Sequence, residues 1–297
     1  MQVKNPITYR EQVQTLKQKG LVILDEQRCE RFLEHVNYYR FASYLYPFRT
    51  GEGRHIPGIS FERIYRVYEF DRKLRSLLLT IMEEIELFLR SRFSYYHAHA
   101  HGPLAYLDAS YYNKGHRHRQ FLRLVENVIS DNEESNIVQH HRKKYGGYFP
   151  LWVVIEFFSV GMLSYFYIDL KEEDKNALAR QLYHTYPPYL DSWLLCLTDL
   201  RNQCAHYSRL YDWDFEHQPE LPADFDFSGT SKVFGQILAL KCLYFQPDEW
   251  EEQFFPKLRG LVEEYQDDIS FDHLGFPDNW MSYLSGPASW RHYYHKP

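Results

Sequence analysis

The chain has 297 residues, of which 44% are hydrophobic and 25% charged, a balance typical of a folded globular protein with one large or two modest domains. Its formal net charge of −6 argues against a protein that coats nucleic acid through a general positive field, although this net charge does not exclude a local basic groove. The four cysteines are spaced too widely for a CxxC metal site and the first residues lack an apolar signal-peptide core, so we expect a reducing, cytoplasmic location.

Helix signals begin close to the N-terminus. Thr8 and Glu11 form a capping box, which predicts a helix that Gly20 ends. Asp25 is a suitable N-cap for a second helix, and Pro47 stops an aromatic-rich third segment.

A long helix is predicted after a loop rich in Gly and Pro. Ser60 can cap this helix, and it extends to about residue 97. Its apolar residues follow one another mostly at spacings of three and four: Ile64, Val67, Leu74, Leu78, Ile81, Ile85, Phe88 and Leu89. Such a helix can form the spine of a bundle.

Residues 151–170 are apolar enough to imitate a membrane span. Glu156 lies inside this segment, however, and Ser159, Gly161 and Ser164 dilute it. We expect a single helix that is buried on all sides, with Glu156 meeting a buried partner, and no association with a membrane.

Further helices are predicted over about 117–129, from Pro187 onward, and over 229–245 and 248–266. No segment shows the alternation of a strand, so the predicted fold class is all-α. We divide the chain into an N-terminal segment (1–56), a helical core (57–216) and a C-terminal extension (217–297) within one compact unit.

Arg201 and His206 share the spacing R-x4-H near the end of the helix that starts at Pro187. About one such spacing is expected by chance in this composition, and a second one joins Arg92 to His97. The polar Asn202 follows Arg201, whereas the apolar Phe93 follows Arg92. This context favours the first pair, and the second is a secondary candidate for RNA contact or catalysis.

On a regular helix Arg201 and His206 point about 140° apart. Asn202, His206 and Arg209 are spaced i, i+4, i+7 and would share one face. Two copies of the chain meeting at this face would place two histidines and two arginines around one cleft, so we expect a homodimer.

Histidine and arginine suit the metal-free cleavage of RNA. A histidine can move the proton of a 2′-hydroxyl at neutral pH, while an arginine neutralises the phosphorane charge. DNA lacks this hydroxyl and is not expected as a substrate. In the alternative, purely structural interpretation, Arg201 pairs with Asp199 or Asp191, and His206 faces the negative end of its helix.

Two basic clusters are candidates for contact with RNA phosphates, although solvated helix faces explain them as well. They are Arg117, Arg119 and Arg123, and Arg142, Lys143 and Lys144. His97, His99 and His101 would share a face only in a strand, so we expect no metal and no cofactor.

The segment RNQCAHYSRL (201–210) resembles the signature of bacterial abortive-infection proteins of the AbiD/AbiF type, which belong to the HEPN superfamily. Other segments agree with this family in order: GLVI (20–23), YYRF (38–41), YPF (46–48), YEFDRKLR (68–75), Ile85-Glu86 with Arg90, and LWVVIE (151–156).

The resemblance implies a HEPN-like helical bundle, usually dimeric, with metal-independent endoribonuclease activity. It assigns Arg201 and His206 as the catalytic pair and Asn202 as the residue that orients them. It also implies a structured RNA that restrains the enzyme. Ser208 stands where related toxins carry Tyr, which argues against control by nucleotidylation of a tyrosine. A non-catalytic module that grips a small RNA, and a structural scaffold, are the alternative functions.

Overall fold

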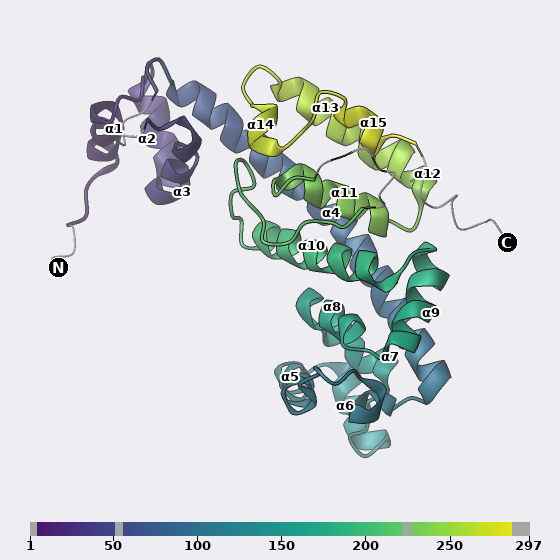
Figure 1. Ribbon diagram of the computed structural model, residues 1–297. Coiled ribbons are helices and arrows are strands. Elements are labelled where there is room, and N and C mark those ends of the chain that lie inside the picture. Colours follow the sequence, from purple (N-terminus) through teal and green to yellow (C-terminus); the bar gives the residue numbers. More distant parts are fainter. Residues whose placement is uncertain (1–4, 51–55, 222–224, 226, 228, 287–297) are drawn as a thin grey trace.

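The computed structural model describes residues 5–50, 56–221, 225, 227 and 229–286, and helices dominate these segments (Figure 1). Within the same segments there is no strand, and the β contacts are two isolated bridges, Val22 with Ser60 and Tyr112 with Leu170. The predicted all-α class is therefore confirmed. No helix in the described ranges combines the length and apolar character that crossing a membrane requires.

Three helices at the N-terminus form a unit at one end of the molecule (Figure 1). They are α1 (Tyr9–Gln18), α2 (Glu26–His35) and α3 (Tyr38–Ser43). The predicted capping box is present, since the Thr8 amide donates to Glu11 Oε2 at 2.7 Å and the Glu11 amide donates to Thr8 Oγ1 at 3.3 Å. Asp25 caps α2 as predicted.

The long helix α4 (Phe61–His101) is the spine of the molecule and contains 41 residues. Ser60 accepts a hydrogen bond from the Arg63 amide at 3.2 Å, as expected of its N-cap. At a rise of about 1.5 Å per residue the helix is about 60 Å long. Helices α1–α3 pack around its start. The helix ends about one turn beyond the predicted residue, because the next residue, Gly102, has a φ of 102°, which an α-helix does not adopt.

Shorter helices gather near the C-terminal end of α4 (Figure 1). They are α5 (His118–Asp131), α6 (Asn136–Lys144), α7 (Leu151–Val154), α8 (Val160–Ile168) and α9 (Glu172–Tyr183). Helix α5 was predicted, whereas α6 and α9 were not expected as separate helices.

The prediction of one helix over 151–170 is wrong. After α7 the chain forms a 3-10 turn and an extended step, and Ser159 then caps α8 by accepting from the Met162 amide at 3.2 Å. Arg90 of α4 donates to the carbonyl oxygens of Ile155, Glu156 and Phe158 at 2.6, 2.9 and 2.7 Å. These bonds replace the backbone hydrogen bonds that a continuous helix would supply. The Glu156 side chain is exposed, so the expected burial of this residue is also wrong.

The remaining helices cover the middle of α4. They are α10 (Pro187–Ala205), α11 (Val233–Leu243), α12 (Pro247–Glu249), α13 (Phe255–Tyr265), α14 (Phe271–Leu274) and α15 (Trp280–Leu284). Helix α10 packs against α4, α8 and α11, and every residue of α11 is buried. The core therefore runs along α4, and α10 brings its C-terminal end close to the N-terminal unit.

Candidate functional site

The motif occupies the last two turns of α10 and the residues that leave it. Helix α10 ends at Ala205, and His206 is its C-cap with φ −85° and ψ 8°. Tyr207 then adopts φ 56°, and the amides of Tyr207 and Ser208 donate to the carbonyl oxygens of Cys204 (3.0 Å) and Gln203 (2.9 Å). This is a Schellman motif with tyrosine in the left-handed position that usually holds glycine.

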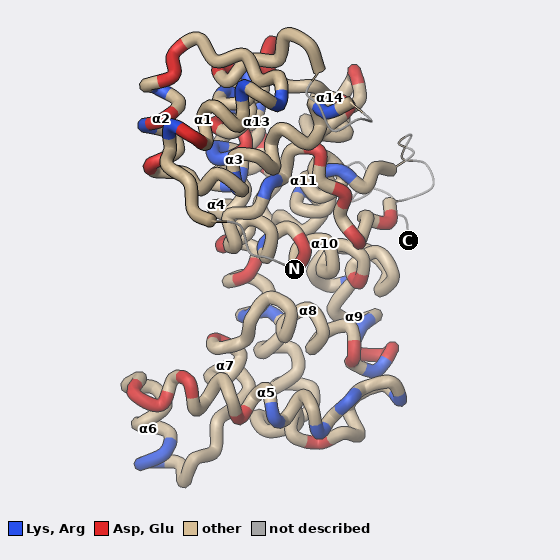
Figure 2. The backbone as a smooth tube through the Cα atoms, turned by 90° about the vertical axis from the view of Figure 1, so that its left-hand side faces the viewer, with Lys and Arg blue, Asp and Glu red and all other residues tan. Residues whose placement is uncertain are grey.

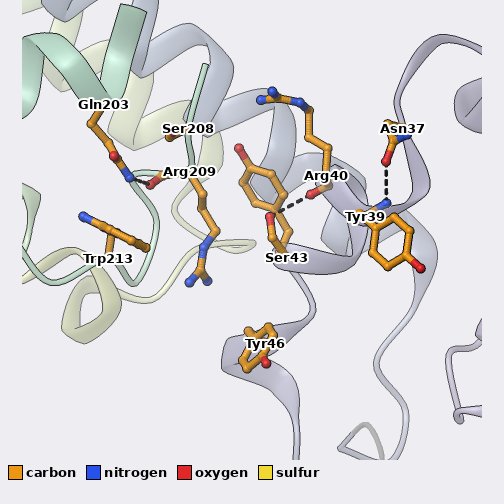
Figure 3. A pocket seen from close by; sticks show the side chains of 10 residues that line it. Asn37, Tyr39, Arg40, Ser43, Tyr46, Gln203, Ser208, Arg209 and Trp213 are labelled. Carbon is orange, nitrogen blue, oxygen red and sulfur yellow. Dashed lines mark hydrogen bonds between the residues drawn. The ribbon is translucent and has the colours of Figure 1, made fainter. Parts of the chain in front are cut away.

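The helix end overturns the expected polar stripe. Asn202 and His206 are both exposed at the end of α10, but the left-handed turn at Tyr207 directs Arg209 elsewhere. Arg209 lines a cavity against α3 instead (Figure 3). An i+7 spacing places residues on one face only where the helix continues through all of them.

Arg201 faces α4 in a hollow of about 380 Å³. Its Nε lies 3.5 Å from Glu86 Oε1, and Arg90 Nη2 lies 3.6 Å from Glu86 Oε2. Burial raises the pKa of the Glu86 carboxyl, and the two guanidinium groups oppose this rise. One carboxylate is thus shared by two cations, and the Arg201 side chain stays 38% exposed, which leaves it accessible to an anionic ligand.

The alternative partners of Arg201 are engaged elsewhere. Asp199 Oδ2 lies 2.8 Å from His217 Nδ1, and Asp191 Oδ2 accepts from Lys175 Nζ at 2.7 Å. The sequence did not indicate Glu86 as the partner, because it lies on a different helix more than a hundred residues earlier.

Arg201 and His206 do not meet within one chain. Arg201 lies against α4, whereas His206 is exposed beyond the last turn of α10. In the part of the chain that the structure describes, no hydrogen bond or ring contact joins their side chains. This matches the divergence of about 140° that a helix imposes over five residues.

A buried charged cluster on α4 fixes the residues that follow the motif. The Asp71 carboxylate is fully buried and accepts from the amides of Leu210 at 3.0 Å and Tyr211 at 2.8 Å. It also accepts from Arg75 Nη1, with which it forms an ion pair, and from the Tyr44 hydroxyl at 2.6 Å. These contacts tie the chain after His206 to the spine helix.

Arg75 completes this cluster by donating to the Ser208 carbonyl oxygen at 3.2 Å. Burial raises the pKa of Asp71, and the charge of Arg75 opposes the rise. The R-x4-H motif does not itself indicate these residues as part of the site. The available signal was a pair of opposite charges at i, i+4 among the apolar positions of a helix, where charges are seldom placed.

The two basic clusters lie away from the motif. Residues Arg119 and Arg123 are on α5, Arg117 precedes it, and Arg142, Lys143 and Lys144 end α6. All six are exposed, and Arg142 lies 3.6 Å from Glu133. Figure 2 shows basic and acidic positions interspersed along this part of the molecule. The structure does not bring these side chains to the end of α10.

The second R-x4-H pair is not brought together either. Arg92 is exposed, whereas His97 is completely buried and neither of its ring nitrogens has a hydrogen-bond partner among the described residues. Burial, followed by the nearby His101, lowers the pKa of His97 to about 4. His101 Nε2 lies 2.9 Å from Asp174 Oδ1, and nowhere in the described ranges do three or more His, Cys, Asp or Glu side chains cluster as metal ligands would.

Comparison with known families gives one match. The family described as "Abi-like protein" matches residues 31–212, more than half of the chain. No curated protein and no solved structure matches the chain. The matched span begins in α2 and includes α4, α10, the buried Asp71 cluster and the R-x4-H motif.

Proposed function

This chain belongs to the Abi-like protein family, and on that premise we propose that it is a metal-independent endoribonuclease that acts in abortive infection. Family membership indicates the role in abortive infection. The nuclease activity is our proposal from the motif, and one observation carries it. His206 and Asn202 are exposed at a helix end that a buried ion pair holds in place, with an accessible arginine one turn away.

In the proposed reaction His206 accepts the proton of an RNA 2′-hydroxyl, whose oxygen attacks the adjacent phosphorus. The bond from phosphorus to the 5′-oxygen breaks, and that oxygen takes up a proton from the protonated His206 of a second copy of the chain. Arg201 donates hydrogen bonds to the phosphorane oxygens and neutralises their charge. The products are a 2′,3′-cyclic phosphate and a 5′-hydroxyl, and Asn202 has the role that the family resemblance implies, which is to orient the catalytic pair.

The geometry of one chain makes a homodimer part of this proposal. Arg201 and His206 of a single copy face different directions, so a second copy would bring its own His206 toward the first Arg201. Glu86 holds Arg201 in a defined direction before RNA arrives. Because Glu86 also pairs with Arg90, Arg201 can turn toward a phosphate without leaving a buried charge unpaired.

The test is cleavage of a labelled RNA by the purified protein in EDTA, beside a DNA of the same sequence. We expect cleavage of RNA alone, with cyclic phosphate or 3′-phosphate ends. His206→Ala and Arg201→Ala should each lower the rate by at least a hundredfold. The matched controls are His35→Ala and Arg259→Ala, which replace an exposed histidine on α2 and an exposed arginine on α13. Cleavage that needs a metal, or that survives both site substitutions, would contradict this mechanism.

The alternative is a binding module that grips a structured small RNA and does not cleave it. The divergence of Arg201 and His206 within one chain favours it, because a single copy does not direct both groups at one phosphate. This function predicts a discrete RNA that co-purifies with the protein and dissociates at high salt. Sequencing the bound RNA and incubating it with the protein distinguishes the two functions, since only the nuclease would shorten it.

A further inference from the structure

A second cavity, separate from the Arg201 hollow, lies between α3 and the loop that follows α10. Its volume is about 680 Å³, within the range of about 300–1,000 Å³ that is usual for small-ligand sites. Residues from both sides line it, among them Tyr39, Arg40 and Tyr46 on one side and Gln203, Arg209 and Trp213 on the other (Figure 3). Gln203 and Ser208, which line the cavity, belong to the same segment as His206, although His206 itself is not a lining residue.

Two guanidinium groups line this cavity, and neither has a carboxylate partner among the described residues. Figure 3 shows Arg209 reaching into the space between Trp213 and the α3 side. Its Nη1 is shielded from solvent and has no hydrogen-bond partner in the described part of the chain. Arg40 donates one bond to the Tyr207 carbonyl oxygen, which leaves its other N–H groups to bind a ligand. An unpaired, partly buried arginine in a cavity with no carboxylate partner favours an anionic ligand.

Aromatic side chains also line this cavity and stay open to solvent. The exposed fractions are 74% for Tyr39, 64% for Tyr46 and 42% for Trp213, which is high for rings of this size. The nucleobases of an RNA of any sequence can stack on such rings, provided that the bases are not already paired in a duplex. Arginine with open aromatic rings therefore fits a phosphate and its base together.

We infer that this cavity binds one nucleotide of a single-stranded RNA, with its phosphate on Arg209 and its base against Trp213. The inference rests on the proposed nuclease function and deepens it, because the cavity would hold a nucleotide that flanks the bond presented to His206. Duplex RNA is not bound here, since its bases are stacked on one another. The N-terminal unit forms the opposite wall of this cavity.

The test is binding of a fluorescein-labelled, 20-nucleotide 2′-O-methyl RNA of random sequence, measured by anisotropy at several salt concentrations. This probe cannot be cleaved, because its 2′-oxygen carries no proton. We expect Arg209→Gln to raise Kd about tenfold and to lower the slope of log Kd against log salt by about one. Trp213→Leu should raise Kd about tenfold, and Trp213→Phe should restore most of the affinity. The control Arg259→Gln, on α13, should leave Kd within twofold.

Three results would overturn the inference: no binding of the probe by the wild-type chain, unchanged Kd for Arg209→Gln, or equal Kd for Trp213→Leu and wild type. The last result would mean that the cavity binds a phosphate but that no base stacks on Trp213. The assay does not depend on cleavage, so the two proposals fail separately. If unmodified RNA is not cut but Arg209→Gln weakens binding, the nucleotide site stands and the nuclease proposal fails. If RNA is cut and Arg209→Gln binds the probe normally, the nuclease proposal stands and the nucleotide site fails.

Discussion

Asp71 is the residue on which the surroundings of the motif depend most. Its carboxylate joins Arg75, Tyr44 and two backbone amides, and its side chain is inaccessible to solvent. Buried ion pairs add little compared with apolar packing, but the loss of one partner leaves a buried charge uncompensated. Asp71 is therefore a positioning residue for the chain that leaves His206.

We predict that Asp71→Ala destabilises the protein by about 3–5 kcal/mol, because Arg75 and two amides lose their partner. The measurement is the free energy of unfolding from denaturant titration, with Asp267→Ala, an exposed position, as the control. A loss below about 1 kcal/mol would show that water or another group replaces the carboxylate.

We predict that His97 makes the stability of the protein depend on pH. Its pKa is about 4 in the folded protein and about 6.5 in the unfolded chain. As pH falls below 6.5 the unfolded chain takes up a proton that the folded protein does not accept until about pH 4. The stabilising contribution is thus complete above pH 6.5 and is lost as pH falls, by about 3 kcal/mol at pH 4.

The measurement is the free energy of unfolding at pH 7 and pH 4 for the wild-type chain and for His97→Phe. His101 and Asp174 act on the same ring and remain in both proteins, so the difference between the two pH effects isolates His97. If the substitution leaves the pH dependence unchanged, His97 is not held neutral by burial.

At the level of the element, the end of α10 is strained at Tyr207. A left-handed conformation costs a residue with a Cβ atom about 1–2 kcal/mol, and glycine avoids most of this cost. We predict that Tyr207→Gly raises the free energy of unfolding by about 1 kcal/mol relative to Tyr207→Ala, since both variants lack the ring. Equal stability of the two variants would mean that the turn relaxes in solution.

The helix starts were predictable because capping is local. Thr8, Asp25 and Ser60 each satisfy an amide three residues away, so a short stretch of sequence contains the whole signal. The break at 155–159 was not predictable in this way, because it depends on Arg90, some 65 residues earlier in the chain.

The same distinction applies to the site. Arg201, Asn202 and His206 were found from a local spacing and all occur at the C-terminal end of α10, although the side chains of Arg201 and His206 point apart. The partner Glu86, the Asp71 cluster and the displaced Arg209 were missed or misplaced, because each depends on packing between distant segments or on a tyrosine in a conformation typical of glycine.

At the scale of the whole molecule, both attachments of the motif belong to one continuous helix. Asp71 holds the chain after His206, and Glu86 holds Arg201, from positions about 22 Å apart along α4. An alanine inserted between Thr80 and Ile81 would rotate one attachment by about 100° relative to the other. We expect this insertion to lower the unfolding midpoint sharply and to abolish RNA cleavage, whereas an alanine inserted between the exposed Gly146 and Gly147 should do neither.

Helix α4 therefore fixes the rotation of the two attachments relative to each other about its axis, as well as supporting the site. We expect the loops of this chain to tolerate insertions and deletions, whereas the stretch of α4 between Asp71 and Glu86 has to keep its length to preserve both attachments. Chains that share this site should vary in the connections around the spine and keep fifteen steps of helix between those two carboxylates.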